Sequence, residues 1–148
     1  MVTSATSPGR PLRVLVVDDN RLFVETLVAT LELTPQLDVV GAAFDGLEAL
    51  DRAERLRPDV VLMDVAMPGL DGVEATHRLR RRLPHVQVVM LSASTAPEDV
   101  WRARAAGAGA YLFKGCRCDD VLAAVVEVCG RGRLRSPLSA AAAPAPAA

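Results

Sequence analysis

Five short apolar runs recur along the chain at regular intervals, and this pattern limits the fold more than any other feature of the sequence. The runs are rich in valine and leucine and mostly lack alternating polar residues. This is typical of strands that are buried on both faces of a parallel sheet. The runs cover residues 12–17, 39–43, 60–63, 86–91 and 110–113.

Segments with a helical repeat lie between these runs. Their apolar side chains recur every three or four residues, which predicts helices with one buried face. The stripes are formed by Phe23, Leu27 and Leu31, by Leu47, Leu50 and Ala53, and by Val121, Leu122, Val125 and Val128.

Residue types that start helices precede several of these segments. Asn20, Asp45 and Asp71 stand where N-caps are expected, and Pro97 suits the first turn of the fourth helix. Strands that alternate with helices need right-handed helical crossovers. The sequence therefore predicts an α/β fold, a five-stranded doubly wound parallel sheet with helices on both faces.

The length of 148 residues suits one domain with a single core. We expect this domain over residues 12–130. A flexible arm is expected at residues 1–11, and a linker or tail at residues 131–148, where proline and alanine dominate.

The charge balance excludes some classes of partner. The net charge is -1, which argues against strong non-specific attraction to DNA or to anionic lipid. We expect no direct DNA binding by this chain and no membrane partner. No long apolar segment and no secretory signal are present, so a cytoplasmic location is expected.

The three cysteines, Cys116, Cys118 and Cys129, are expected to be free thiols in a chain without an export signal. Cys116 and Cys118 are two residues apart and could hold a metal ion. A structural zinc site needs four ligands, however, and neither a nearby histidine nor a second cysteine pair is present.

Polar residues cluster where the strands end. Ligands of doubly wound sheets bind at the carboxyl ends of the strands, and these positions carry Asp18, Asp19, Asp64, Ser92 and Lys114. Three carboxylates that converge at one edge repel one another unless a cation neutralises them. Mg²⁺ prefers oxygen ligands and is often shared with a phosphate, so we predict a Mg²⁺ cofactor.

Four segments resemble the signature blocks of the response regulator receiver domain (CheY-like) of bacterial two-component systems, in order and spacing. They are VLVVDDN (14–20), VLMDVAMPGLDG (61–72), VVMLSAS (88–94) and GAYLFKG (109–115). The resemblance implies a flavodoxin-like sheet with strand order 2-1-3-4-5. Gly115 follows Lys114 where many receivers have proline, and the isomer of that peptide bond is left open. This block is most similar to the subfamily that usually carries a LuxR-type helix-turn-helix, which is absent after residue 130.

The resemblance also implies a role for each site residue. Asp64 would be the nucleophile that accepts a phosphoryl group from a sensor histidine kinase. Asp18, Asp19 and Asp64, with the backbone carbonyl of Ala66, would hold Mg²⁺. Lys114 would pair with the acyl phosphate, and it is the only lysine among 17 basic residues.

A switch is implied as well. Ser92 would bond a phosphoryl oxygen, and Tyr111 would turn into the space that Ser92 leaves. The signal would then pass through the face formed by the fourth helix, the fifth strand and the fifth helix. Downstream, the sequence leaves open a protein target, a homodimer, or a DNA-binding module that is missing.

Two alternatives use the same kind of sheet. A Mg²⁺-dependent phosphatase-like hydrolase would also use Asp64 as its nucleophile, but Val65 and Ala66 follow it where such enzymes carry a second acid. A flavin-binding domain would need aromatic residues to stack the flavin, and the sequence offers only Trp101 and Tyr111, late in the chain. It also has no Ser/Thr-rich phosphate loop after the first strand. We therefore expect no enzyme activity beyond self-phosphorylation and self-dephosphorylation.

Overall fold

The computed structural model describes residues 9–133, and side chains up to residue 131. Five parallel strands form one sheet in the order β3-β2-β4-β5-β6, which is the predicted order 2-1-3-4-5. The strands are β2 (Leu12–Val17), β3 (Leu37–Ala43), β4 (Val60–Asp64), β5 (Gln87–Ser92) and β6 (Ala110–Phe113).

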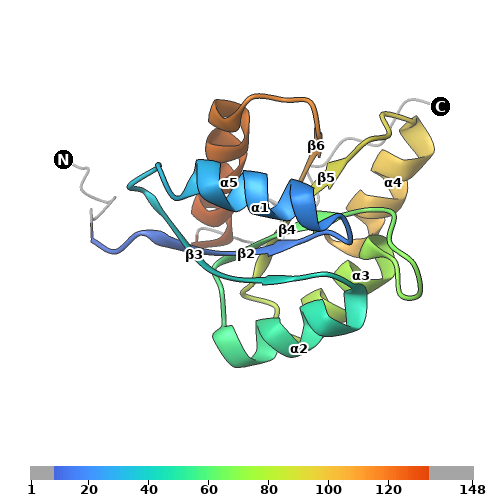
Figure 1. Cartoon of the computed structure of the whole chain (residues 1–148). Helices are drawn as coiled ribbons and strands as arrows, with labels where there is room; N and C mark the ends of the chain where they lie inside the picture. The colour runs from blue at the N-terminus through green and yellow to red at the C-terminus, as the bar shows by residue number, and fades with distance from the viewer. Residues whose placement is uncertain (1–8, 134–148) are drawn as a thin grey trace.

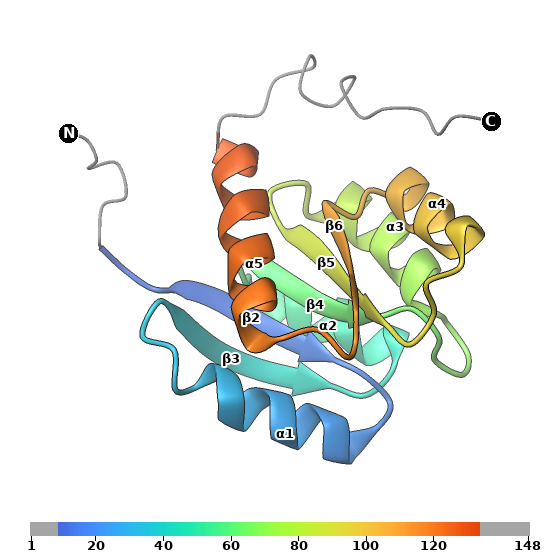
Figure 2. The ribbon, with the colours of Figure 1, turned by 90° about the horizontal axis from the view of Figure 1, so that it is seen from above.

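Five helices alternate with the strands and cover both faces of the sheet (Figure 1). Helices α1 and α5 pack on one face, and α2, α3 and α4 belong to the core on the other. A view turned by 90° shows the same layers: the strands lie between α1 and α5 on one side and the remaining helices on the other (Figure 2). The helices are α1 (Arg21–Leu31), α2 (Gly46–Leu56), α3 (Gly72–Arg82), α4 (Pro97–Ala106) and α5 (Cys118–Arg133).

The core consists of two apolar layers, one on each side of the sheet. The central strand β4 is buried along its whole length, whereas the edge strands β3 and β6 are partly exposed. One expected core residue is exposed. Leu47 is 64% exposed, because the buried face of α2 is formed by Gly46, Ala49, Leu50 and Ala53.

The predicted helix starts are confirmed. The side chains of Asn20, Asp45 and Asp71 accept hydrogen bonds from the backbone N–H groups three residues later. Pro97 occupies the first turn of α4. These caps fix where each helix leaves the loop that follows its strand, and those loops carry the candidate site.

Helix α5 runs to Arg133, so the expected start of the tail at residue 131 falls inside a helix. Residues 1–8 of the expected arm and residues 134–148 of the expected tail lie outside the described range.

Residues 9–133 contain no helix with both the length and the apolar character needed to cross a bilayer. Cys116, Cys118 and Cys129 form no disulfide bond. No peptide bond in this range is cis, so the Lys114–Gly115 bond is trans.

Candidate functional site

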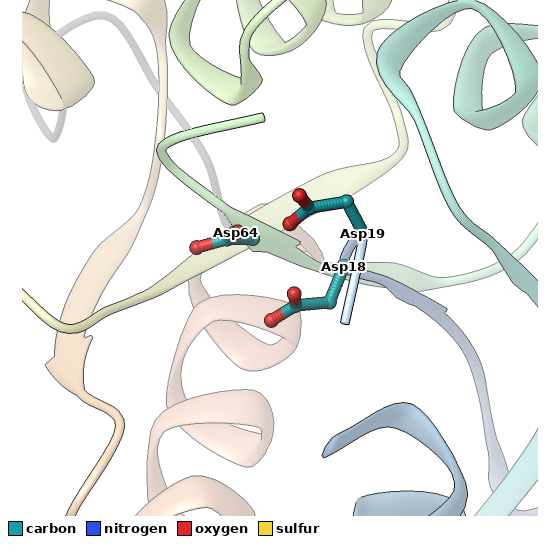
Figure 3. Close-up of side chains that lie close together, drawn as sticks. All are labelled: Asp18, Asp19 and Asp64. Carbon is teal, nitrogen blue, oxygen red and sulfur yellow. The ribbon is translucent and has the colours of Figure 1, made fainter. Parts of the chain in front are cut away.

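Three carboxylates meet at the carboxyl edge of the sheet. Strands β2 and β4 are parallel neighbours with Val17 opposite Met63, so Asp18 and Asp64 follow a matched pair. One oxygen from each of Asp18, Asp19 and Asp64 lies within 4.8 Å of the others (Figure 3). The structure therefore brings together the acidic residues that the sequence singled out.

The two inner carboxylates are buried. Asp18 is 1% exposed and Asp64 is 5% exposed, whereas Asp19 faces solvent. Oδ1 of Asp18 accepts a hydrogen bond of 2.9 Å from the backbone N–H of Asn20. Oδ2 of Asp18 accepts no hydrogen bond, although the ammonium of Lys114 lies 2.5 Å away. The negative charge on this buried oxygen therefore has to be neutralised by a cation.

Lys114 supplies that cation. Its Nζ also lies 3.3 Å from Oδ1 of Asp64, and it sits 4.6 Å from the centroid of the Phe23 ring. The backbone N–H of Lys114 donates to the carbonyl of Ser92 over 2.8 Å, which ties this residue to the end of β5. Burial alone would lower the pKa of Lys114, but the ion pairs with Asp18 and Asp64 outweigh it and raise the pKa.

Asp64 is difficult to ionise in this setting. Burial first, and then the charge of Asp18, raise the pKa of Asp64 to about 6, even though Lys114 acts in the opposite direction. A bound cation would reverse this effect because it stabilises the ionised carboxylate.

The residues present fit a magnesium ion. Carboxylates are the hard oxygen ligands that Mg²⁺ prefers, and one lysine leaves the three acids short of positive charge. The buried Oδ2 of Asp18 is ion-paired with Lys114, and this oxygen could also coordinate a metal ion. Asp18, Asp19 and Asp64 could thus share the ion, and Ala66 is an exposed residue of the loop that follows β4.

Ser92 is the buried last residue of β5. Its hydroxyl oxygen accepts from the backbone N–H of Ser94 over 2.9 Å, so its own proton is available to an incoming acceptor. The hydroxyl of Tyr111 on β6 donates to the carbonyl of Ser94 over 2.9 Å. The loop between β5 and α4 therefore links the proposed switch residues.

The role of Gly72 was not predicted from the sequence. A Cβ at this position would lie 1.8 Å from the carbonyl oxygen of Asp64, and the N–H of Gly72 donates to the carbonyl of Val65 over 2.8 Å. Helix α3 thus begins directly against the backbone of the candidate acceptor. The available signal was a glycine directly after a helix N-cap.

Known proteins resemble this chain in sequence. Residues 14–126 match the response regulator receiver domain family. The transcriptional regulatory protein LnrK of Bacillus subtilis is 36% identical over 85% of this chain and 57% of its own length. The response regulator protein VraR of Staphylococcus aureus is 36% identical over 77% of this chain and 54% of its own length. The chain thus spans about half the length of these curated relatives.

Solved structures of response regulators resemble this chain in fold. The signal receiver domain of NarL from Mycobacterium tuberculosis is 36% identical, with a TM-score of 0.77 over 82% of this chain and 98% of that one. A LuxR-family response regulator from Aurantimonas is 27% identical, with a TM-score of 0.77 over 81% of this chain and 86% of that one. A structure of a CheX–CheY complex with BeF3 and Mg from Borrelia burgdorferi is 26% identical, with a TM-score of 0.75 over 82% of this chain and 92% of that one. The sheet order, the acidic edge and these matches lead to one conclusion: the chain belongs to the response regulator receiver domain family.

Proposed function

We propose that this chain is a phosphorylation-dependent signalling switch in which Asp64 accepts a phosphoryl group from a sensor histidine kinase. The observation that carries the proposal is the contact of Lys114 with both Asp18 and Asp64 at the carboxyl edge of the sheet. It joins the candidate nucleophile, the candidate metal ligands and a cation in one site.

The transfer follows from the chemistry of these groups. A carboxylate oxygen of Asp64 attacks the phosphorus of a phosphohistidine, a P–O bond forms, and the P–N bond breaks. The imidazole leaves with the bonding electron pair and takes up a proton from solvent. Phosphoryl transfer depends mainly on positioning and charge neutralisation, and Lys114 is placed for the second task.

Mg²⁺ is the proposed cofactor, held by Asp18, Asp19, Asp64 and the carbonyl of Ala66. When bound, the ion would neutralise negative charge on the carboxylates and the phosphoryl oxygens. Asp18 is anchored for this role by its bond to the N–H of Asn20. The related complex from Borrelia burgdorferi contains both BeF3 and Mg, which supports the same ion here.

The switch would begin at Ser92, whose hydroxyl proton can be donated to a phosphoryl oxygen. Movement of Ser92 would disturb the Ser94 loop, to which Tyr111 is bonded. The surface of α4, β6 and α5 would then change shape and carry the signal. A ligand drives such a change only if it binds one state more tightly, and the contact of phosphate with Ser92 provides that difference.

The partners follow from this role. They are a histidine kinase upstream and, downstream, a protein target, a second copy of the chain or a DNA-binding module. The hydrolase alternative lacks a general acid, because the residue two positions after Asp64 is the apolar Ala66.

The test is phosphorylation by acetyl phosphate, followed by separation of the phosphoprotein on a phosphate-affinity gel. We expect one modified site, formed only with Mg²⁺ or Mn²⁺ present, and no modification of the Asp64→Asn variant. Asp71→Asn is the matched control, because Asp71 is a nearby acid that caps α3 and lies outside the acidic cluster. An undiminished phosphoprotein band in Asp64→Asn would overturn the proposal.

A further inference from the structure

A hollow opens between α1 and α5, and Lys114 lines it as well as contacting the acidic cluster. The volume of the hollow is about 160 Å³, similar to that of a cavity that holds a benzene-sized guest. Phe23, Leu27 and Val121 form apolar walls, and Cys116 and Cys118 also line it. Nothing in the proposed phosphorylation chemistry uses this hollow.

Two cysteines line this hollow. Cys116 and Cys118 are both half-buried free thiols, and Cys118 is the first residue of α5. Burial first, and then the charge of Asp120, raise the pKa of the Cys116 thiol, with a smaller contribution from Cys118. The two cysteines are separated by one residue and line the same hollow.

These features select one class of ligand. Thiolates are soft ligands that favour Cu(I), which accepts two of them in a linear arrangement, whereas structural zinc needs four ligands. The carboxylate of Asp120 opposes negative charge on Cys116 and therefore favours a cation in place of the thiol proton. Two thiolates around one Cu(I) carry a net charge of about -1 by formal count, and Lys114 is among the residues that line the same hollow.

We propose that Cys116 and Cys118 form a dithiol site for a monovalent thiophilic ion of the Cu(I) class, in the hollow between α1 and α5. Binding converts two thiols and one Cu(I) into a copper dithiolate and two released protons. The anionic product attracts Lys114 away from Asp18 and Asp64. This second effect rests on the proposed function, and it predicts slower phosphorylation of the copper-bound protein.

Binding is tested with the full chain under argon, by titrating Cu(I), generated with ascorbate, against bicinchoninate as a competing chelator. We expect one Cu(I) per chain, and at least a tenfold weaker affinity in Cys116→Ser and in Cys118→Ser. Cys129→Ala is the matched control, because Cys129 lies on α5 but does not line the hollow. Unchanged affinity in both serine variants would overturn the proposal.

Two further readouts keep the test independent of variant folding and of phosphorylation. X-ray absorption at the copper edge of the wild-type protein should show two sulfur ligands, and nitrogen or oxygen ligands would overturn the site. One equivalent of Cu(I) should slow phosphorylation by acetyl phosphate several-fold in wild type but not in the Cys116→Ser/Cys118→Ser variant. An unchanged rate would overturn the coupling to Lys114. A wild-type protein that is never phosphorylated would contradict the proposed function, while the copper titration would still decide the site.

Discussion

Gly72 touches the backbone of Asp64 so closely that no side chain fits between them. A Cβ at Gly72 would lie 1.8 Å from the carbonyl oxygen of Asp64 and 2.8 Å from its carbonyl carbon. Since backbone cannot move aside as a flexible side chain can, the first turn of α3 and the end of β4 must separate if this glycine is replaced.

Gly72→Ala should therefore lower the free energy of unfolding by at least about 2 kcal/mol and slow phosphorylation, because the acceptor backbone shifts. Gly130→Ala is the matched control, since this helical glycine on α5 has no heavy atom near the added Cβ. It should stabilise the protein by up to about 1 kcal/mol. Urea unfolding of both variants checks the pair, and equal stabilities would contradict the contact.

The raised pKa of Asp64 predicts a stability cost at neutral pH. Its pKa in the folded protein is about 6, above the ordinary value of 3.8, so the folded state holds the proton more tightly than the unfolded state. Stability therefore falls as the pH rises through this window. Asp64→Asn removes the buried charge and should be more stable than wild type by about 2 kcal/mol at pH 7.5 without Mg²⁺.

The same comparison carries its own control. At a pH of about 3.5 the wild-type carboxyl is largely protonated in both states, so the advantage of Asp64→Asn should nearly disappear. Saturating Mg²⁺ should also reduce the advantage, because the ion stabilises the wild-type fold. Urea midpoints at acid and neutral pH, with and without Mg²⁺, check both statements, and a variant less stable than wild type at neutral pH would contradict them.

Protons and divalent cations should compete for this site. Because the pKa of Asp64 is about 6, the affinity for Mn²⁺ should be nearly constant above pH 7 and fall about tenfold per pH unit below 6. Electron paramagnetic resonance of free Mn²⁺ measures this directly. Asp18→Asn should weaken binding at every pH, whereas an affinity that does not change between pH 5 and 8 would show that Asp64 is not a ligand.

The fold followed from the sequence because its signals are local and repeated. The valine-rich runs specify the strands. The helix starts are specified by the N-caps Asn20, Asp45 and Asp71 and by Pro97, and parallel pairing of the strands then gives the sheet. The meeting of Asp18, Asp19 and Asp64 followed from the same topology. Side-chain direction did not follow: Leu47 fits the helical stripe but points to solvent, because the smaller Gly46 and Ala49 pack against the core.

Contacts between loops and the elements packed against them could not be predicted from the sequence either. The approach of Gly72 to Asp64 and the bond from Tyr111 to Ser94 depend on how loops of different length pack, which periodicity does not encode. The hollow beside Cys116 and Cys118 depends in the same way on the spacing of α1 and α5. The sequence showed the cysteine pair but not the space in front of it.

Lys114→Arg tests the cation at the centre of the site. A guanidinium is larger and planar, so it fits poorly into the space where Nζ of Lys114 lies 2.5 Å from Asp18 and 3.3 Å from Asp64. We expect the variant to keep its fold, because it retains a positive charge beside the two carboxylates. Phosphorylation by acetyl phosphate should slow at least tenfold, an estimate based on the loss of one charge-assisted contact.

Arg131→Lys is the control for an exchange between arginine and lysine. Arg131 is exposed, and its described contact is a hydrogen bond to the carbonyl of Gly109. It should match wild type in rate and in stability. A phosphorylation time course, with Trp101 fluorescence on α4 as a second readout, separates transfer from the later change of surface. If Lys114→Arg accepts phosphate at the wild-type rate and gives the same fluorescence change, the ammonium has no specific part in the transfer, and the ion pairs with Asp18 and Asp64 serve only to balance buried charge.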